Sequence, residues 1–133
     1  MKKEIAKKWV KELRSGKYRQ GSEFLKQPDY YNKSVQHCCL GVLCELYNKE
    51  MKKNKGKTLK ESYDEGVYYF NKSYEVLPYS VKKWAGLKDV GGEFRNKTLE
   101  YGDEVYSSLA EMNDGLVSFK RIATVIEKNV ENL

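Results

Sequence analysis

The chain has 133 residues, of which 40% are apolar and 33% charged, and its 25 Lys and Arg outnumber 19 Asp and Glu. This length suits one domain and excludes a (β/α)₈ barrel, which needs about 200 residues or more. The apolar and aromatic content excludes a disordered chain, and the lack of any apolar stretch near about 18 residues excludes a membrane span.

Positive charge is concentrated in the first half of the chain. Residues 1–60 contain 16 Lys and Arg and 6 Asp and Glu, a net charge of +10, whereas residues 61–133 contain 9 and 13, a net charge of −4. A basic first half favours an anionic partner such as a nucleotide, a nucleic acid or an acidic protein surface. A solvated lysine-rich surface is the alternative. The N-terminus lacks the apolar middle of a secretory signal, so we expect a cytoplasmic protein.

Three cysteines lie close together at Cys38, Cys39 and Cys44. An odd number in one apolar segment argues against a disulfide framework. A tetrahedral zinc site needs four ligands, and two adjacent cysteines with the single histidine, His37, supply that geometry poorly. We therefore expect buried, reduced cysteines, with no metal and no cofactor.

The first half predicts two helices separated by a loop. A helix over residues 3–15 carries one apolar face and ends at Ser15-Gly16. Residues 17–36 show no sustained period, so we expect a loop with one short helical turn. Residues 37–50 are apolar on nearly all sides and predict a central buried helix, in which Gly41 lets a neighbour approach closely. The apolar face of the first helix comprises Ile5, Trp9, Val10 and Leu13.

The second half predicts short strands and three short helices. Residues 52–60 are basic and contain Gly56, so an exposed, disordered link is expected. Residues 66–76 favour a strand or hairpin, with a turn at Asn71-Lys72-Ser73. Further strand signals occur at 93–95 and 98–101. Helices are expected to begin at Pro78, after the capping-box residue Ser108, and after Ser118.

These elements together predict an α+β fold in a single domain spanning residues 1–133. Four to five helices should surround the central buried helix (37–50), with a small antiparallel sheet formed by the second half.

One cysteine is placed where a nucleophile could lie. Cys38 falls at a predicted helix N-terminus, which lowers a thiol pKa, but nucleophilic catalysis also needs a base. The only histidine is the adjacent His37, and neighbouring residues on a helix point about 100° apart. No P-loop, Rossmann or zincin motif occurs. We therefore expect a protein that is not an enzyme, with a cysteine hydrolase as the enzymatic alternative.

The loop after the first helix holds the best candidates for ligand contact. Tyr18, Arg19 and Gln20 combine an aromatic face, a guanidinium fork and an amide beside Gly21, the parts needed to stack a base and hold a phosphate. The alternative is a connector whose tyrosine packs on the helix and whose charges face water. Asn113 is either a helix cap or a polar recognition residue.

Several segments, in order, resemble a family of small uncharacterised proteins found in tailed-bacteriophage genomes. The most specific is Cys38-Cys-Leu-Gly-Val-Leu-Cys44-Glu-Leu46. The others are Leu13-Arg-Ser-Gly-Lys-Tyr18-Arg-Gln20-Gly21, Leu77-Pro78 with Trp84-Ala-Gly-Leu87, and Leu109-Ala-Glu-Met-Asn113-Asp114 with Phe119, Ile122 and Ile126.

That resemblance implies a phage origin without an established activity. Small phage proteins outside the virion are often accessory, and one group sequesters the cyclic-nucleotide or ADP-ribose-derived signals of host immunity. We therefore expect a non-enzymatic anti-defence protein that binds a small anionic, nucleotide-derived ligand, as a homo-oligomer and away from membranes. The alternative is a protein-interaction module that inhibits a host protein; direct nucleic-acid binding is a third reading. The expected ligand contacts are Tyr18, Arg19 and Gln20, with Arg95, Asn113 and Arg121 as secondary contacts.

Overall fold

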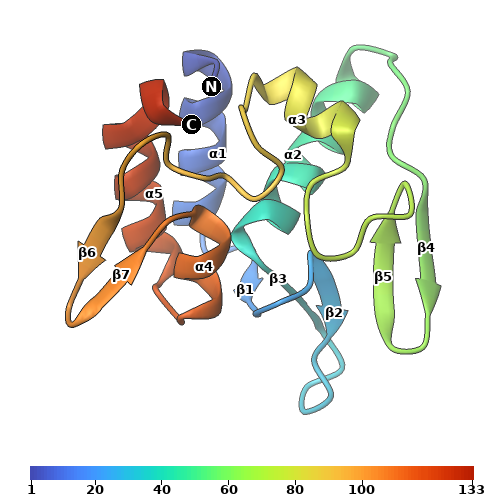
Figure 1. Ribbon diagram of the computed structural model, residues 1–133. Helices are drawn as coiled ribbons and strands as arrows, with labels where there is room; N and C mark the ends of the chain where they lie inside the picture. Colours follow the sequence, from blue (N-terminus) through green and yellow to red (C-terminus); the bar gives the residue numbers. More distant parts are fainter.

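Five α-helices and seven short strands make up the computed structural model, which describes residues 1–133 (Figure 1). The expected α+β class is confirmed, as is the number of helices. The helices are α1 (Lys3–Arg14), α2 (Cys39–Lys53), α3 (Tyr79–Ala85), α4 (Leu109–Asp114) and α5 (Phe119–Asn129), followed by a 3₁₀ turn, η1 (Val130–Asn132). The strands are β1 (Arg19–Gln20), β2 (Lys26–Pro28), β3 (Val35–His37), β4 (Glu61–Asp64), β5 (Val67–Phe70), β6 (Leu99–Tyr101) and β7 (Glu104–Tyr106).

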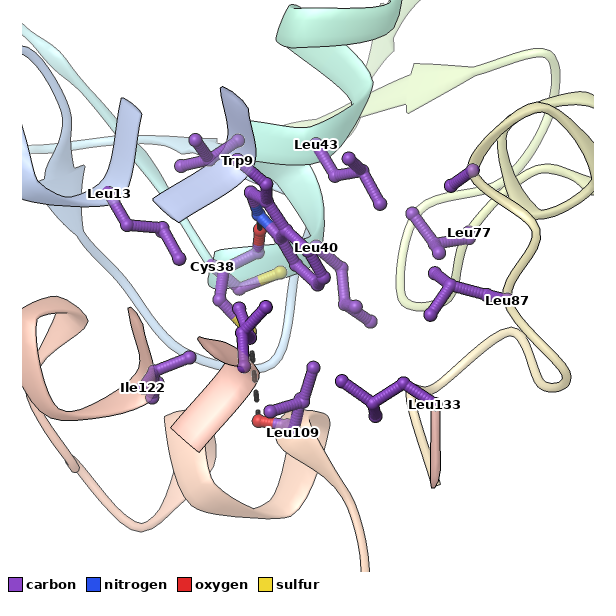
Figure 2. Packing of buried hydrophobic residues seen from close by; sticks show 14 of the residues in the cluster. Trp9, Leu13, Cys38, Leu40, Leu43, Leu77, Leu87, Leu109, Ile122 and Leu133 are labelled. Carbon is purple, nitrogen blue, oxygen red and sulfur yellow. Dashed lines mark hydrogen bonds between the residues drawn. The ribbon is translucent and has the colours of Figure 1, made fainter. Parts of the chain in front are cut away.

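The central helix α2 is buried along its first half, as its apolar sequence predicts. Trp9 of α1 packs against it, and the indole Nε1–H donates to the Cys39 carbonyl at 3.0 Å. Gly41 permits the approach of another segment, because a Cβ there would lie 1.7 Å from the Leu25 carbonyl oxygen. The side chains that surround α2 in Figure 2 come from all along the chain: Trp9, Leu13, Leu77, Leu87, Leu109, Ile122 and Leu133.

Helices α1 and α5 lie side by side and bring the two ends of the chain together (Figure 1). Arg14 and Glu127 join them on the surface, with Nη1 to Oε1 at 2.6 Å and Nη2 to Oε2 at 2.9 Å. The N-terminal amino group donates to the Leu133 carbonyl at 2.7 Å. No helix of the protein is both long enough and apolar enough to cross a bilayer.

The segment between α1 and α2 is a small sheet, and the expected helical turn within it is wrong. The strand order is β1-β3-β2, with β1 parallel and β2 antiparallel to β3. Strands of two and three residues are too short to show an alternating pattern, so no strand is predictable from the sequence of this segment. This sheet brings His37 beside Lys26 and sets the start of α2.

The basic link after α2 is ordered, contrary to expectation. Helix α2 continues to Lys53, and Leu59 is buried with its N–H donating to Asn48 Oδ1 at 2.7 Å. A single apolar residue among lysines, Leu59, therefore fixes the path of residues 57–60 against the core.

The second half forms two antiparallel hairpins, which confirms the predicted antiparallel pairing there. β4 pairs with β5, and β6 pairs with β7. The predicted turn after β5 is also present, since Phe70 and Ser73 exchange backbone hydrogen bonds around Asn71 and Lys72. In Figure 1 the β4–β5 hairpin lies at the opposite side of the molecule from the β6–β7 hairpin.

Candidate functional site

Gln20 and Asn113 lie together in a buried polar network. Gln20 Nε2 donates to Asn113 Oδ1 at 3.1 Å and to the Val117 carbonyl at 2.7 Å. Asn113 Oδ1 also accepts from the Cys39 N–H at 3.0 Å, and its Nδ2 donates to the Gly21 carbonyl at 2.8 Å. Asn113 is fully buried. Both amides thus have partners within the protein, and they join β1, α2 and α4.

Tyr18 and Arg19 lie at the edge of the same sheet in different environments. The Tyr18 ring meets the His37 ring edge to face, with centroids 5.1 Å apart. Burial, followed by the charges of Glu12 and Glu45, raises the pKa of Tyr18 to about 12. The Arg19 side chain is 60% exposed, with Nη2 at 3.4 Å from Asp29 Oδ2.

Arg95 and Arg121 line two different hollows. Arg95 lies in the loop before β6, in a hollow of about 580 Å³ where acidic and basic side chains are mixed. The Arg121 guanidinium lies over the Tyr101 ring, 5.2 Å from its centroid. The structure therefore brings Gln20 and Asn113 into contact, while Arg95 and Arg121 occupy separate surfaces. None of the five main hollows is lined by Tyr18, Arg19, Gln20 or Asn113.

Three lysines surround a hollow that the sequence analysis did not single out. Lys57, Lys60 and Lys72 line a concavity of about 500 Å³ together with Ser62 and Asn71, and we call it the lysine hollow. Its volume lies within the range of about 300–1,000 Å³ typical of small-molecule sites. It has no acidic and no apolar lining residue. The local potential is therefore positive and suited to a multiply charged anion.

Like most lysines of the chain, the three lysines of this hollow have no acidic partner within 4.0 Å. Lys8, Lys26 and Lys49 each lie within 3.0 Å of a carboxylate oxygen. None of Lys57, Lys60 and Lys72 takes part in an ion pair within 4.0 Å. Three like charges around one concavity repel one another in water, and a bound anion would relieve that repulsion.

Backbone contacts fix both sides of the lysine hollow. The Lys60 N–H donates to Asn71 Oδ1 at 2.7 Å, and the Asn71 N–H donates to the Lys60 carbonyl at 2.9 Å. These two bonds hold the start of β4 against the turn that follows β5. Because the Asn71 side-chain oxygen is used in this way, its Nδ2 group is the donor left for a ligand.

Lys72 occupies a strained backbone position in that turn. Asn71 and Lys72 have φ values of +50° and +71°, which define a type I′ turn between Phe70 and Ser73. This turn favours glycine at its second central position, and the β4–β5 turn does place Gly66 there, after Glu65. A lysine in the left-handed region costs about 1 kcal/mol. A charged side chain thus occupies a position where glycine would be more stable, as also happens at Lys33 and Lys55 outside the hollow.

Tyr69 lies on the same face of the β4–β5 hairpin as Ser62 of the lysine hollow, outside the set of lining residues. Ser62 is paired directly with Tyr69, and directly paired residues of an antiparallel ladder share a face. The Tyr69 ring is 5.2 Å from the Tyr74 ring, at an interplanar angle of 53°. An aromatic surface beside a cationic hollow provides the two elements that a nucleotide requires, stacking for the base and charge for the phosphate.

The cysteines are buried and unpaired. Burial raises the pKa of the Cys38 thiol to about 11, which outweighs the opposing contact in which Gly41 N–H donates to Cys38 Sγ. The thiol is therefore protonated at neutral pH and a weak nucleophile. His37 is buried beside Glu45, with Nε2 at 3.8 Å from Oε1. No group of three or more His, Cys, Asp or Glu side chains is placed to hold a metal ion.

The lysine hollow was not predicted from the sequence, because its residues come from separate segments of the chain. Lys57 and Lys60 precede β4, Ser62 lies within it, and Asn71 and Lys72 follow β5. The available signals were the cluster of lysines at 52–60 and the predicted turn at 71–73. Only the pairing of β4 with β5 brings the two together.

Residues 1–130 match a family described as a domain of unknown function, DUF8296, so the chain belongs to that family. No curated protein and no solved structure matches the chain.

Proposed function

We propose that this member of the DUF8296 family binds and sequesters a small phosphate-bearing, nucleotide-derived ligand without transforming it. The observation that supports the proposal is the lysine hollow, where three unpaired lysines surround about 500 Å³ free of acidic side chains. Sequestration requires affinity and shape alone, and no catalytic residue. In this proposal, which follows the resemblance to phage proteins, the protein acts in the host cytoplasm as an accessory protein directed against a host immune signal.

In this proposal the phosphates lie among Lys57, Lys60 and Lys72, and the base stacks on Tyr69. Each lysine contributes a point charge with rotatable donors, so the hollow recognises charge density more than one fixed phosphate geometry. Tyr18, Arg19 and Gln20 then serve mainly to hold the sheet that carries the start of α2.

Calorimetric titration with cyclic dinucleotides and cyclic ADP-ribose isomers tests the proposal. Protein at about 50 μM detects a binding free energy near −6 kcal/mol or tighter. Substitution of Lys57, Lys60 and Lys72 by Gln should weaken binding at least tenfold. The matched control replaces Lys83, Lys97 and Lys120, exposed lysines outside the hollow, and removes the same net charge. Absence of heat with every ligand, or equal loss in the two triple variants, would exclude the proposal.

The salt dependence of binding separates a small ligand from a nucleic acid. A small ligand held by three lysines gives a shallow dependence on salt, because few counterions are released. An extended nucleic acid contacts more phosphates and loses affinity steeply between about 50 and 200 mM salt. A steep dependence for a single-stranded oligonucleotide, with no response to the small ligands, would favour the nucleic-acid reading instead.

One observation favours a second candidate function, inhibition of a host protein. Leu116 is 79% exposed and has a φ of +63°, a conformation that a leucine adopts only at a cost. An exposed apolar side chain held by a strained backbone suits insertion into a partner protein. Leu116→Asn tolerates the same backbone and removes the apolar group. The native chain should then retain a host protein in stoichiometric amount. If Leu116→Asn loses that protein while the triple variant of Lys57, Lys60 and Lys72 retains it, inhibition of a host protein is favoured over ligand sequestration.

A further inference from the structure

A small hollow between the β6–β7 hairpin and α5 differs in character from the lysine hollow. It measures about 140 Å³ and is lined on its apolar side by Leu99, Tyr101, Met112 and Val125. None of its lining residues belongs to the lysine hollow. The volume resembles that of an engineered cavity of about 150 Å³ that holds one benzene ring. Its apolar capacity therefore matches a single six-membered ring or a branched aliphatic group.

Two cations stand among the polar lining residues. Arg121 lies over the Tyr101 ring at 5.2 Å, and neither Arg121 nor Lys128 has a carboxylate within 4.0 Å. Glu100 is the one acidic residue of the lining. The excess of positive charge favours an anionic group on the ligand, and the guanidinium of Arg121 can hold a carboxylate through two parallel hydrogen bonds.

A buried acceptor without a partner lies in the same lining. Asn129 is only 5% exposed, and its Nδ2 donates to the Val125 carbonyl at 2.8 Å. That bond fixes the orientation of the amide, and Oδ1 is left buried with no hydrogen-bond partner. That oxygen has almost no accessible surface, so a ligand in the hollow does not reach it, and the unpaired acceptor lowers the stability of the fold instead.

We propose that this hollow is a second binding site, for a small carboxylate with a ring-sized apolar body. The body packs against Met112 and Val125, and the carboxylate pairs with Arg121 at the rim. The site is independent of the proposed nucleotide site, because the two share no residue.

Titration of the ¹⁵N-labelled full chain with 4-hydroxybenzoate and with its neutral analogue 4-hydroxybenzamide tests this site. The amide resonances of Leu99, Met112 and Val125 should shift in a saturable way. 4-Hydroxybenzoate should bind about fivefold more tightly, because only its carboxylate carries the charge that pairs with Arg121. Equal affinity for the two probes, or no shift up to about 10 mM of either, a limit that reveals dissociation constants near 1 mM, would overturn the proposal.

Paired variants locate the binding on the hollow. Arg121→Gln should weaken 4-hydroxybenzoate binding about tenfold, whereas Lys120→Gln, its exposed neighbour on α5 outside the lining, should leave it unchanged. The variant that replaces Lys57, Lys60 and Lys72 should also leave it unchanged, so failure here is distinguishable from failure of the nucleotide proposal. Equal binding by the native chain and Arg121→Gln would refute the site.

Discussion

The side-chain amides of Gln20 and Asn113 are hydrogen-bonded at 3.1 Å across 93 positions of the chain. The same Asn113 oxygen also accepts a hydrogen bond from the Cys39 N–H at the start of α2. Asn113, which the sequence suggests as a helix cap or a ligand contact, thus holds neighbouring elements of the fold together. The network connects β1, α2 and α4 inside the core, where a missing partner is expensive.

Asn113→Ala should lower the free energy of unfolding by roughly 3 kcal/mol, because it leaves the Cys39 N–H and the Gly21 carbonyl buried without partners. Urea denaturation measures the change. Asn132→Ala, at a partly exposed position, is the control and should change stability by less than about 0.5 kcal/mol. A loss below about 1 kcal/mol for Asn113→Ala would show that the network contributes little.

Helices with a clear apolar face were predictable, and long-range polar contacts were not. The pattern of Ile5, Trp9 and Leu13 locates α1, and the apolar run from Cys38 identifies the central helix. The bond between Gln20 and Asn113 leaves no local pattern, since each residue alone looks like ordinary loop or cap chemistry.

The lysine hollow, like the bond between Gln20 and Asn113, could not be predicted from local sequence patterns. Lysines spread along a basic segment look alike in sequence, and solvation explains most of them. The pairing of β4 with β5 brings three of them around one hollow, and that pairing is a consequence of tertiary structure. The aromatic and basic loop at Tyr18–Gln20 had the right composition, but its amide is engaged inside the protein.

Gly41→Ala should destabilise the protein by at least about 2 kcal/mol, although alanine is the better helix former. The added Cβ would lie 1.7 Å from the Leu25 carbonyl oxygen, so the β1–β2 segment must move away from α2. The control is Gly56→Ala, whose Cβ would meet the flexible end of Met51 at 2.8 Å. Thermal unfolding of both variants checks this, and equal midpoints would contradict the close approach.

The Cys38 thiol should react with a disulfide reagent only when the protein unfolds. Burial raises its pKa to about 11, so at pH 8 the folded protein holds almost no thiolate. Because the folded-state pKa is raised, its contribution to stability is complete below pH 9 and declines as the pH rises toward 11. Labelling rates in native buffer and in urea measure the difference. Rapid labelling of the native protein would instead support the cysteine-hydrolase alternative.

Glu111 should make the stability of α4 dependent on pH. Its Oε2 accepts from the Ser107 N–H at 2.7 Å and from the Ser107 hydroxyl at 2.8 Å, and these bonds lower the pKa of the carboxyl below 4.5. The resulting stabilisation is present above pH 4.5 and is lost as the pH falls through the lowered pKa. Native protein should therefore exceed Glu111→Gln in unfolding free energy at pH 7 and approach it at pH 3. A difference that stays constant over that range would exclude the carboxylate as its source.

Lys72→Gly tests the central claim most directly, because stability and binding should change in opposite directions. Glycine relieves the left-handed strain at φ +71° and should raise the free energy of unfolding by about 1 kcal/mol. The same change removes one of the three charges of the lysine hollow and should weaken binding of the tightest-bound cyclic nucleotide about fivefold, as measured by calorimetry. A variant that is more stable and binds less tightly would support the lysine hollow as the binding site; a variant that is more stable and binds equally well would contradict it.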